Sequence, residues 1–341
     1  ALYDSLVATF FIWSLYLAIL LVRRVRLDVA LLLGMTLGAG MLNKSSGFLS
    51  LYMLPSTLLL FDWKKERRVP RLLTWGGYIV IAAVLSQLMY GILRLSPLYH
   101  MIEQKNAVFV YPFSEWIVHP IQFLEGNMKG LIDWLQGYMT IPMLIVALGS
   151  VVLMPKRIRE YLLMICWWAA PFVALAMFGR VLYPRFILFM TMPLFVLAAW
   201  AIELLMTSIR VPLWRIAMLI VVLGTSIWID YFIVTNPLYA QIPAADRGQM
   251  IDNWPAGWGV REVNAFIENE AKKEPVAVIT EGTFGLFPYA IEMYLVSNPN
   301  VEIVGIWPLP KEIPDEVAEK ARSKPTYFVL NESQEPPSWP L

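Results

Sequence analysis

The feature that most constrains this chain is a short polar stretch inside a long apolar run. Apolar residues extend from Val29 to Phe61, and Leu42-Asn43-Lys44-Ser45-Ser46-Gly47 interrupts them. One straight helix of this length would measure about 50 Å at ~1.5 Å per residue, whereas a hydrocarbon core is only ~30 Å thick. It would also place Lys44 near the bilayer centre, where a charge is costly. We therefore predict two short spans joined by a turn at 43–46, with Lys44 just below one membrane surface.

The rest of the chain has the composition of a membrane protein. Of its 341 residues, 58% are apolar and 16% are charged, against roughly 25% charged in soluble proteins. The predicted fold class is a polytopic α-helical membrane protein with about eight transmembrane helices, two of them short, followed by a small extracytoplasmic α/β domain. The net charge of +1 gives no basic excess that would indicate a nucleic-acid partner. The eight apolar runs lie at 5–22, 29–42, 47–61, 72–95, 137–154, 160–178, 186–206 and 216–234.

Basic residues are distributed unequally between alternate turns. One set of turns holds thirteen of them, and the other set, which includes the Lys44 turn, holds six. Short basic loops stay in the cytoplasm, so the turns with more basic residues are expected on the cytoplasmic side of a plasma membrane. The Lys44 turn, the loop after Leu95 and the segment after Val234 are then outside. The richer set is Arg23, Arg24, Arg26, Lys64, Lys65, Arg67, Arg68, Arg71, Lys156, Arg157, Arg159, Arg210 and Arg215.

This topology predicts three parts. Residues 1–235 form the transmembrane domain, and 96–135 form an outer-surface loop with an interfacial helix. The aromatic and charged residues of that loop suit the headgroup region, and a lid over a lipid-facing site is the alternative interpretation. Residues 236–341 form the extracytoplasmic domain, with fifteen acidic and eight basic residues.

Helix-like and strand-like segments alternate in 236–341, which predicts βαβ units and a small parallel sheet. Helices are expected at 260–271, 289–295 and 313–322, and strands at 276–280, 301–307 and 326–330. The pattern GxGxxG does not follow the first of these strands, so a dinucleotide cofactor is not expected.

Two cations on the predicted outer side are the first candidates for a binding site. Lys44 precedes Ser45, Ser46 and the start of a helix, whose backbone N–H groups attract anions. Arg185 opens a span, with Arg180 nearby, and its planar guanidinium matches phosphate oxygens. Lys44 and Arg185 are therefore candidates to hold one lipid phosphate. The alternatives are a snorkelling lysine and arginines that only meet outer headgroups.

Acidic candidates are fewer. Asp4 stands at the mouth of the first span, either as an N-cap or as a polar group at the rim of a cavity. Glu103, near His100 and Lys105, is a further candidate for substrate binding. Neither a zinc-ligand spacing nor a nucleotide or hydrolase motif is present in the sequence, so cofactors remain unassigned.

Three short elements resemble the GT-C superfamily of membrane glycosyltransferases, especially the protein O-mannosyltransferase and aminoarabinose transferase group. They are Tyr3-Asp4-Ser5, Leu42-Asn43-Lys44-Ser45 and Tyr183-Pro184-Arg185-Phe186, in this order and topology. The segment 253–259 also resembles a junction in prokaryotic members with an outer C-terminal domain. Ser5 replaces a proline, and Asn43 replaces a threonine, of the family pattern.

The resemblance implies a hexosyl or pentosyl transferase that uses a polyprenyl-phosphate-linked sugar as donor and acts on the outer face of the membrane. The acceptor would be a protein or a glycolipid, and membrane lipids would surround the protein. Lys44 and Arg185 match the positions that hold the lipid phosphate, and Asp4 matches the aspartate of an Asp-Pro pair. The family's catalytic carboxylate lies upstream of Ala1, so residues 1–341 alone are expected to be inactive. A divalent metal is compatible with this chemistry, although no ligand cluster indicates one.

Two functions from other classes remain open. A transporter or flippase for lipid-linked intermediates would also need Lys44 and Arg185 to face a lipid phosphate. It would be expected to contain an internal repeat, and none is apparent in the sequence. A non-catalytic binding subunit would instead use the outer domain to recruit partners.

Overall fold

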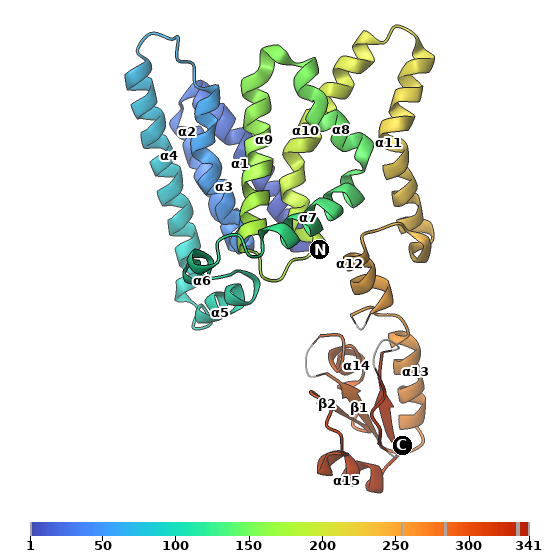
Figure 1. Ribbon diagram of the computed structural model, residues 1–341. Coiled ribbons are helices and arrows are strands. Elements are labelled where there is room, and N and C mark those ends of the chain that lie inside the picture. The colour runs from blue at the N-terminus through green and yellow to red at the C-terminus, as the bar shows by residue number, and fades with distance from the viewer. Residues whose placement is uncertain (1, 254, 283–284, 332–334, 340–341) are drawn as a thin grey trace. The chain divides into compact units, whose positions relative to one another are not determined.

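The computed structural model describes residues 2–253, 255–282, 285–331 and 335–339, without the side chains of Leu2 and Glu103. The chain divides into two compact units, Ala1–Pro243 and Ala244–Leu341, which we call unit 1 and unit 2. In the described residues unit 1 is helical, and the β-strands lie in unit 2 (Figure 1). The division between the units follows Pro243, eight residues after the predicted boundary at residue 235, which is the end of α11.

All eight predicted apolar runs lie in helical segments of unit 1. The segments, in chain order, are α1 (Leu2–Arg24), α2 (Leu27–Asn43), η1 (Ser45–Gly47), α3 (Phe48–Met53), η2 (Leu54–Leu60), α4 (Arg68–Gly91), η3 (Ile92–Leu95), α5 (His100–Phe109), α6 (Phe113–Val118), α7 (Leu124–Met139), α8 (Ile141–Leu153), η4 (Pro155–Arg157), α9 (Ile158–Phe178), η5 (Pro184–Ile187), α10 (Leu188–Ser208), α11 (Pro212–Thr235) and η6 (Pro237–Tyr239).

Five of the described helices are long and apolar enough to cross a membrane, and a bent pair would make six. The five are Tyr3–Arg24, Arg68–Leu95, Pro155–Phe178, Pro184–Ser208 and Pro212–Thr235. The second and third predicted spans are short, as expected, at Leu27–Asn43 and Ser45–Leu60. The protein therefore has the character of a membrane protein, whereas the number eight stays a prediction.

The predicted span 137–154 is divided by a sharp bend. Helices α7 and α8 meet at 100°, and the apolar helix begins only at Ile141. Pro142 lies in the first turn of α8, where its missing N–H does no harm, but the same residue could not continue α7. Thr140, between the two helices, has a φ of 63°, which is uncommon outside glycine. Residues 137–139 therefore belong to the preceding amphipathic helix.

The core of unit 1 lies where α1, α9 and α10 meet. The ring of Phe11 on α1 packs edge-on against Trp167 and Phe189, with centroid distances of 5.0 Å to each. The Trp167 indole N–H donates to Ser56 Oγ at 2.9 Å, which attaches η2 to the same core. Aromatic pairs of this kind add stabilisation beyond the area that they bury.

Glycines bring α2 and α4 into close contact. A Cβ added at Gly34 would lie 2.9 Å from the carbonyl oxygen of Ala82, and one at Gly38 would lie 2.7 Å from Met89 Sδ. In a membrane, burying apolar side chains between helices gains little free energy, because the lipid is equally apolar. Helices therefore associate mainly through close backbone packing at small residues. The spacing of Gly34 and Gly38 is the small-xxx-small pattern of such interfaces.

We expect Gly34→Ala to destabilise unit 1, because the rigid Ala82 carbonyl would have to move. The loss should be about 1–3 kcal/mol, as for other overpacked sites. Gly76→Ala on α4 is the matched control, since a Cβ there meets nothing within 4 Å and alanine favours the helix. Thermal unfolding of the purified protein in detergent measures both, and equal melting temperatures would contradict the close packing.

The predicted basic turns gather at one end of unit 1. Arg71 Nη2 donates to the carbonyl oxygens of Val22 (3.2 Å) and Arg23 (2.5 Å). Arg23 Nη2 in turn lies 3.3 Å from Glu160 Oε1. The turns after α1, before α4 and before α9 are therefore neighbours, at the upper end of these helices in Figure 1.

Unit 2 contains the small parallel sheet that the sequence predicts. Strands β1 (Val276–Glu281), β2 (Val301–Ile306) and β3 (Thr326–Val329) pair in parallel in the order β2-β1-β3. Helices α13 (Val260–Ala271) and α14 (Tyr289–Leu295) pack on the face of Val276 and Val278. Helix α15 (Asp315–Ser323) packs on the opposite face with Ile279. The short segments α12 (Ala244–Arg247) and η7 (Gly248–Asp252) precede them.

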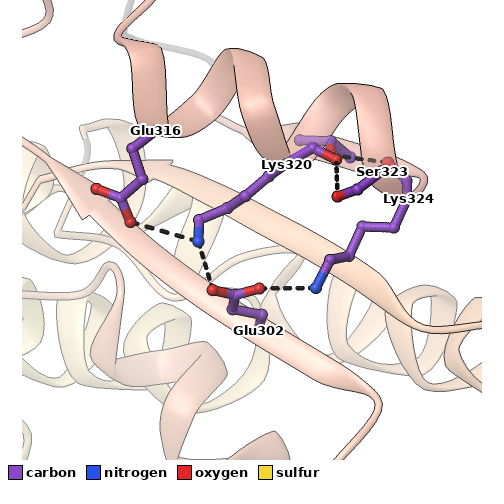
Figure 2. A network of polar contacts seen from close by, with 6 residues as sticks. Glu302, Glu316, Lys320, Ser323 and Lys324 are labelled. Atoms are coloured by element: carbon purple, nitrogen blue, oxygen red, sulfur yellow. Dashed lines mark hydrogen bonds and ion pairs between the residues drawn. The ribbon is translucent and has the colours of Figure 1, made fainter.

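An ion-pair network joins α15 to β2 (Figure 2). Glu302 on β2 accepts a hydrogen bond from Lys320 through Oε1 and another from Lys324 through Oε2, the latter at 2.8 Å. Lys320 also lies 3.4 Å from Glu316 Oε1. The hydrogen bonds from Lys320 and Lys324 lower the pKa of Glu302 from its ordinary 4.5 to about 2.

This network should make the packing of α15 depend on pH. Because the pKa of Glu302 is lowered in the folded protein, ionised Glu302 contributes to the free energy of unfolding above about pH 4.5. This contribution is lost as the pH falls toward 2. Hydrogen exchange of peptides from β2 and α15, corrected for the intrinsic rate, should increase over this window. Glu302→Gln should remove the dependence, while Glu268→Gln on the exposed face of α13 should retain it. An unchanged pH profile in Glu302→Gln would show that the network is inconsequential.

Candidate functional site

The Lys44 turn is fixed against α2 by a glycine contact. Helix α2 ends at Asn43, Lys44 is extended, with φ −161° and ψ 145°, and η1 follows. A Cβ at Gly47 would lie 2.4 Å from the carbonyl oxygen of Gly40, so this turn can fold back on α2 only with glycine. Asn43 Nδ2 donates to the carbonyl of Tyr3 at 2.8 Å, which attaches the turn to the first turn of α1.

Arg185 reaches the same place from a distant part of the chain. Tyr183 is extended, as expected before a proline, and η5 begins at Pro184 and leads directly into α10. Pro184 and Ile187 are buried, which anchors the segment that carries Arg185.

Asp4 lies between the two cations. Its Oδ1 accepts a hydrogen bond from Lys44 Nζ, and its Oδ2 lies 3.7 Å from Arg185 Nε. The Asp4 side chain is only 10% exposed, against 30% for Lys44 and 44% for Arg185. A carboxylate buried to this extent needs positive partners, and both candidates supply them. Of the five candidate residues, the structure thus brings together Asp4, Lys44 and Arg185, which we call the Asp4 cluster.

The structure corrects the interpretation of Asp4 as an N-cap. Helix α1 begins at Leu2, so Asp4 lies inside the first helical turn instead of before it. A carboxylate in this turn is still favoured by the helix dipole. Its closest partners, however, are side chains from two other segments, which local sequence rules cannot reveal.

Aromatic rings surround the Asp4 cluster. Lys44 Nζ lies 4.2 Å from the centroid of the Phe186 ring, and the Arg185 guanidinium lies 4.6 Å from that of Tyr183. The Phe109 ring of α5 packs against both aromatic residues, at 6.1 Å from Phe186 and 6.5 Å from Tyr183. Cation–π contacts keep the two charges oriented without neutralising them.

Helix α5, which carries the candidate Glu103, borders the site through Asn106 and Phe109, two residues that the sequence analysis did not single out. Ser45 Oγ in η1 donates to Asn106 Oδ1 at 3.0 Å, and Asn106 lies one turn before Phe109. The mixed polar and aromatic composition of 96–135 was the available signal, but it did not single out Asn106. Glu103 lies in α5 too, although its side chain is outside the described part of the structure.

Arg180 lies beside the Asp4 cluster without joining it. Its guanidinium lies 5.7 Å from the centroid of the Tyr111 ring, and the described residues give it no ion pair. Its backbone N–H donates to the Phe109 carbonyl at 2.8 Å, and Tyr111 N–H donates to the Phe178 carbonyl at the same distance. These bonds form an antiparallel bridge between Val110 and Gly179.

Asn127 on α7 holds the start of the segment that carries both arginines. Its Nδ2 donates to the carbonyl oxygens of Ala176 (3.0 Å) and Gly179 (2.8 Å), the free carbonyls where α9 ends. The amphipathic helix α7 therefore fixes where the chain leaves α9 on its way to Arg180 and Arg185.

The chemistry available at the Asp4 cluster is anion binding. One carboxylate and two cations leave one positive charge, which favours an added anion in a low-dielectric environment. Within the described residues, no three His, Cys, Asp or Glu side chains are grouped so as to hold a metal ion. A comparison with protein-family models, with curated proteins and with solved structures gave no match.

The cations and the carboxylate of the cluster should depend on each other energetically. Asp4→Asn and Lys44→Met should each lower the stability of unit 1, by about 1–3 kcal/mol, because each leaves a partly buried charge without its partner. The double variant should lose less than the sum, since neither charge then remains. Thermal unfolding of the three variants in detergent measures this coupling energy. If the stability losses of the two single variants add up to that of the double variant, the contact between Asp4 and Lys44 does not contribute to stability.

Proposed function

We propose that unit 1 binds the phosphate of a polyprenyl-phosphate-linked sugar and belongs to a membrane glycosyltransferase of the GT-C type. The observation that carries the proposal is the Asp4 cluster, in which two cations distant in sequence lie on one carboxylate. Phosphate is a leaving group whose developing negative charge needs such cations. Lysine supplies a compact charge, and arginine supplies a planar donor that pairs with two phosphate oxygens.

The membrane arrangement in this proposal follows from charge. The basic turns would lie in the cytoplasm. The chain would cross the plasma membrane eight times if the two short segments Leu27–Asn43 and Ser45–Leu60 and the helix α8 each count as one span in addition to the five long helices. The Asp4 cluster and unit 2 would then lie on the outer side. Just below the outer membrane surface, Lys44 and Arg185 would contact the lipid phosphate, and the prenyl chain would lie among the helices.

The proposed reaction is a single displacement at the anomeric carbon. The acceptor hydroxyl or amine attacks this carbon, the bond to the phosphate oxygen breaks, and a carboxylate takes the acceptor's proton. Lys44 and Arg185 stabilise the departing polyprenyl phosphate. Unit 2 would hold the protein or glycolipid acceptor. The resemblance assigns this carboxylate base to none of residues 1–341.

Binding of polyprenyl phosphate to the purified chain tests the proposal most directly. Native mass spectrometry should show adducts with the wild-type chain, and Lys44→Ala and Arg185→Ala should each weaken them about tenfold or more, as expected for the loss of a charged hydrogen bond. Arg94→Ala and Lys129→Ala, which remove cations outside the Asp4 cluster, are the matched controls. The uncharged polyprenol should bind weakly to all variants.

Two results would remove the proposal. One is that the wild-type chain binds polyprenol as tightly as polyprenyl phosphate. The other is that Lys44→Ala and Arg185→Ala both bind polyprenyl phosphate as tightly as the wild type. Transfer is a separate test, made in liposomes with the full-length protein. Donor binding without any transfer of labelled sugar would favour a carrier of lipid-linked intermediates over a transferase.

A further inference from the structure

A cavity with charged residues in its wall lies at the end of unit 1 opposite to the Asp4 cluster, where the basic turns gather. Its volume is about 390 Å³, and it opens between the turn after α8 and the last part of α10. Two cations, Lys156 and Arg157, and one carboxylate, Glu203, line it together with Trp200. The side chains of Leu153 and Leu204 complete the wall, and both are exposed, so the cavity continues into an apolar surface.

Among the residues that the structure describes, the charged side chains of this cavity are unpaired, unlike several others at the same end. Arg23 pairs with Glu160, and Arg26 pairs with Asp28. Within the described residues, Lys156, Arg157 and Glu203 form no ion pair with any side chain. The Arg157 guanidinium instead lies 5.3 Å from the centroid of the Trp200 ring.

We propose that this cavity binds a phospholipid headgroup that carries both a phosphate and a primary ammonium, as in phosphatidylethanolamine. Lys156 and Arg157 suit the phosphate, and basic pockets between transmembrane helices are known lipid sites. Glu203 suits the ammonium, which can donate hydrogen bonds to it. Trp200 is of the residue type that favours the membrane interface, and Leu153 and Leu204 lead toward the acyl chains.

Charge complementarity decides between headgroups. An anionic lipid without an amine would satisfy the two cations but would leave Glu203 without a cationic partner. A choline headgroup has a cation without N–H donors, so it cannot hydrogen-bond the carboxylate. A headgroup that carries both a phosphate and a primary ammonium complements all three charges. The site is independent of the Asp4 cluster, which lies at the other end of the same helices.

Native mass spectrometry of the full chain in detergent tests the proposal. The probes are phosphatidylethanolamine, phosphatidylglycerol and phosphatidylcholine with identical acyl chains. The ethanolamine lipid should bind most tightly to the wild type. The double variant Lys156→Gln/Arg157→Gln should weaken it about tenfold. Glu203→Gln should remove the preference over phosphatidylglycerol. Lys64→Gln/Arg68→Gln, which removes the same charges from an exposed turn at this end, should change binding less than twofold.

Three outcomes would overturn the proposal. The first is phosphatidylglycerol binding to the wild type as tightly as the ethanolamine lipid. The second is ethanolamine-lipid binding that neither cavity variant changes. The third is displacement of the lipid by millimolar glycerophosphoethanolamine, which would identify a soluble phosphate ester as the ligand. Melting temperatures equal to that of the wild type serve as the folding control for each variant.

Discussion

The carboxylate of Asp4 is the group on which one end of unit 1 depends. Without it, Lys44 and Arg185 would be like charges held close together, and they would repel each other. With it, α1, the turn after α2 and the start of α10 share one electrostatic anchor. Solvent and salt screen this anchor little, because the Asp4 side chain is only 10% exposed. Segments distant in sequence are thus fixed where the apolar helices end.

This anchor works because backbone packing brings the segments close enough. Gly34 and Gly38 let α2 lie directly on α4, while Gly47 lets the Lys44 turn fold back on the Gly40 carbonyl. Glycine normally weakens a helix by about 1 kcal/mol, so its repeated use along α2 indicates a requirement for close approach. The position of Lys44 is therefore a consequence of small residues on both sides of it, from Gly34 on α2 to Gly47 in the turn itself.

Much of this architecture can be predicted from sequence, because the determinants are local. The apolar runs in the sequence predicted the long apolar helices of unit 1 and its two short apolar segments. The alternation of helix-like and strand-like segments predicted the parallel sheet of unit 2. The length of the run from Val29 to Phe61 required a turn at Lys44. The 100° bend at Thr140 was missed, because apolar periodicity continues through it and only Pro142 hints at the break. Asn106 and Phe109 were missed because tertiary contacts alone make them part of the site.

The charge balance of the Asp4 cluster also constrains what a bound lipid can do. Because Asp4 already satisfies part of the positive charge, an arriving phosphate meets a prearranged site with one net positive charge instead of two free cations. Under the proposed function, such a site would bind the anion without holding it permanently, and Arg185, which is 44% exposed, would be the side from which the anion approaches and leaves. A transferase of the proposed kind must release polyprenyl phosphate after each transfer. A carboxylate between the two cations therefore favours turnover over storage of the lipid, since tighter binding of the leaving group would slow its release.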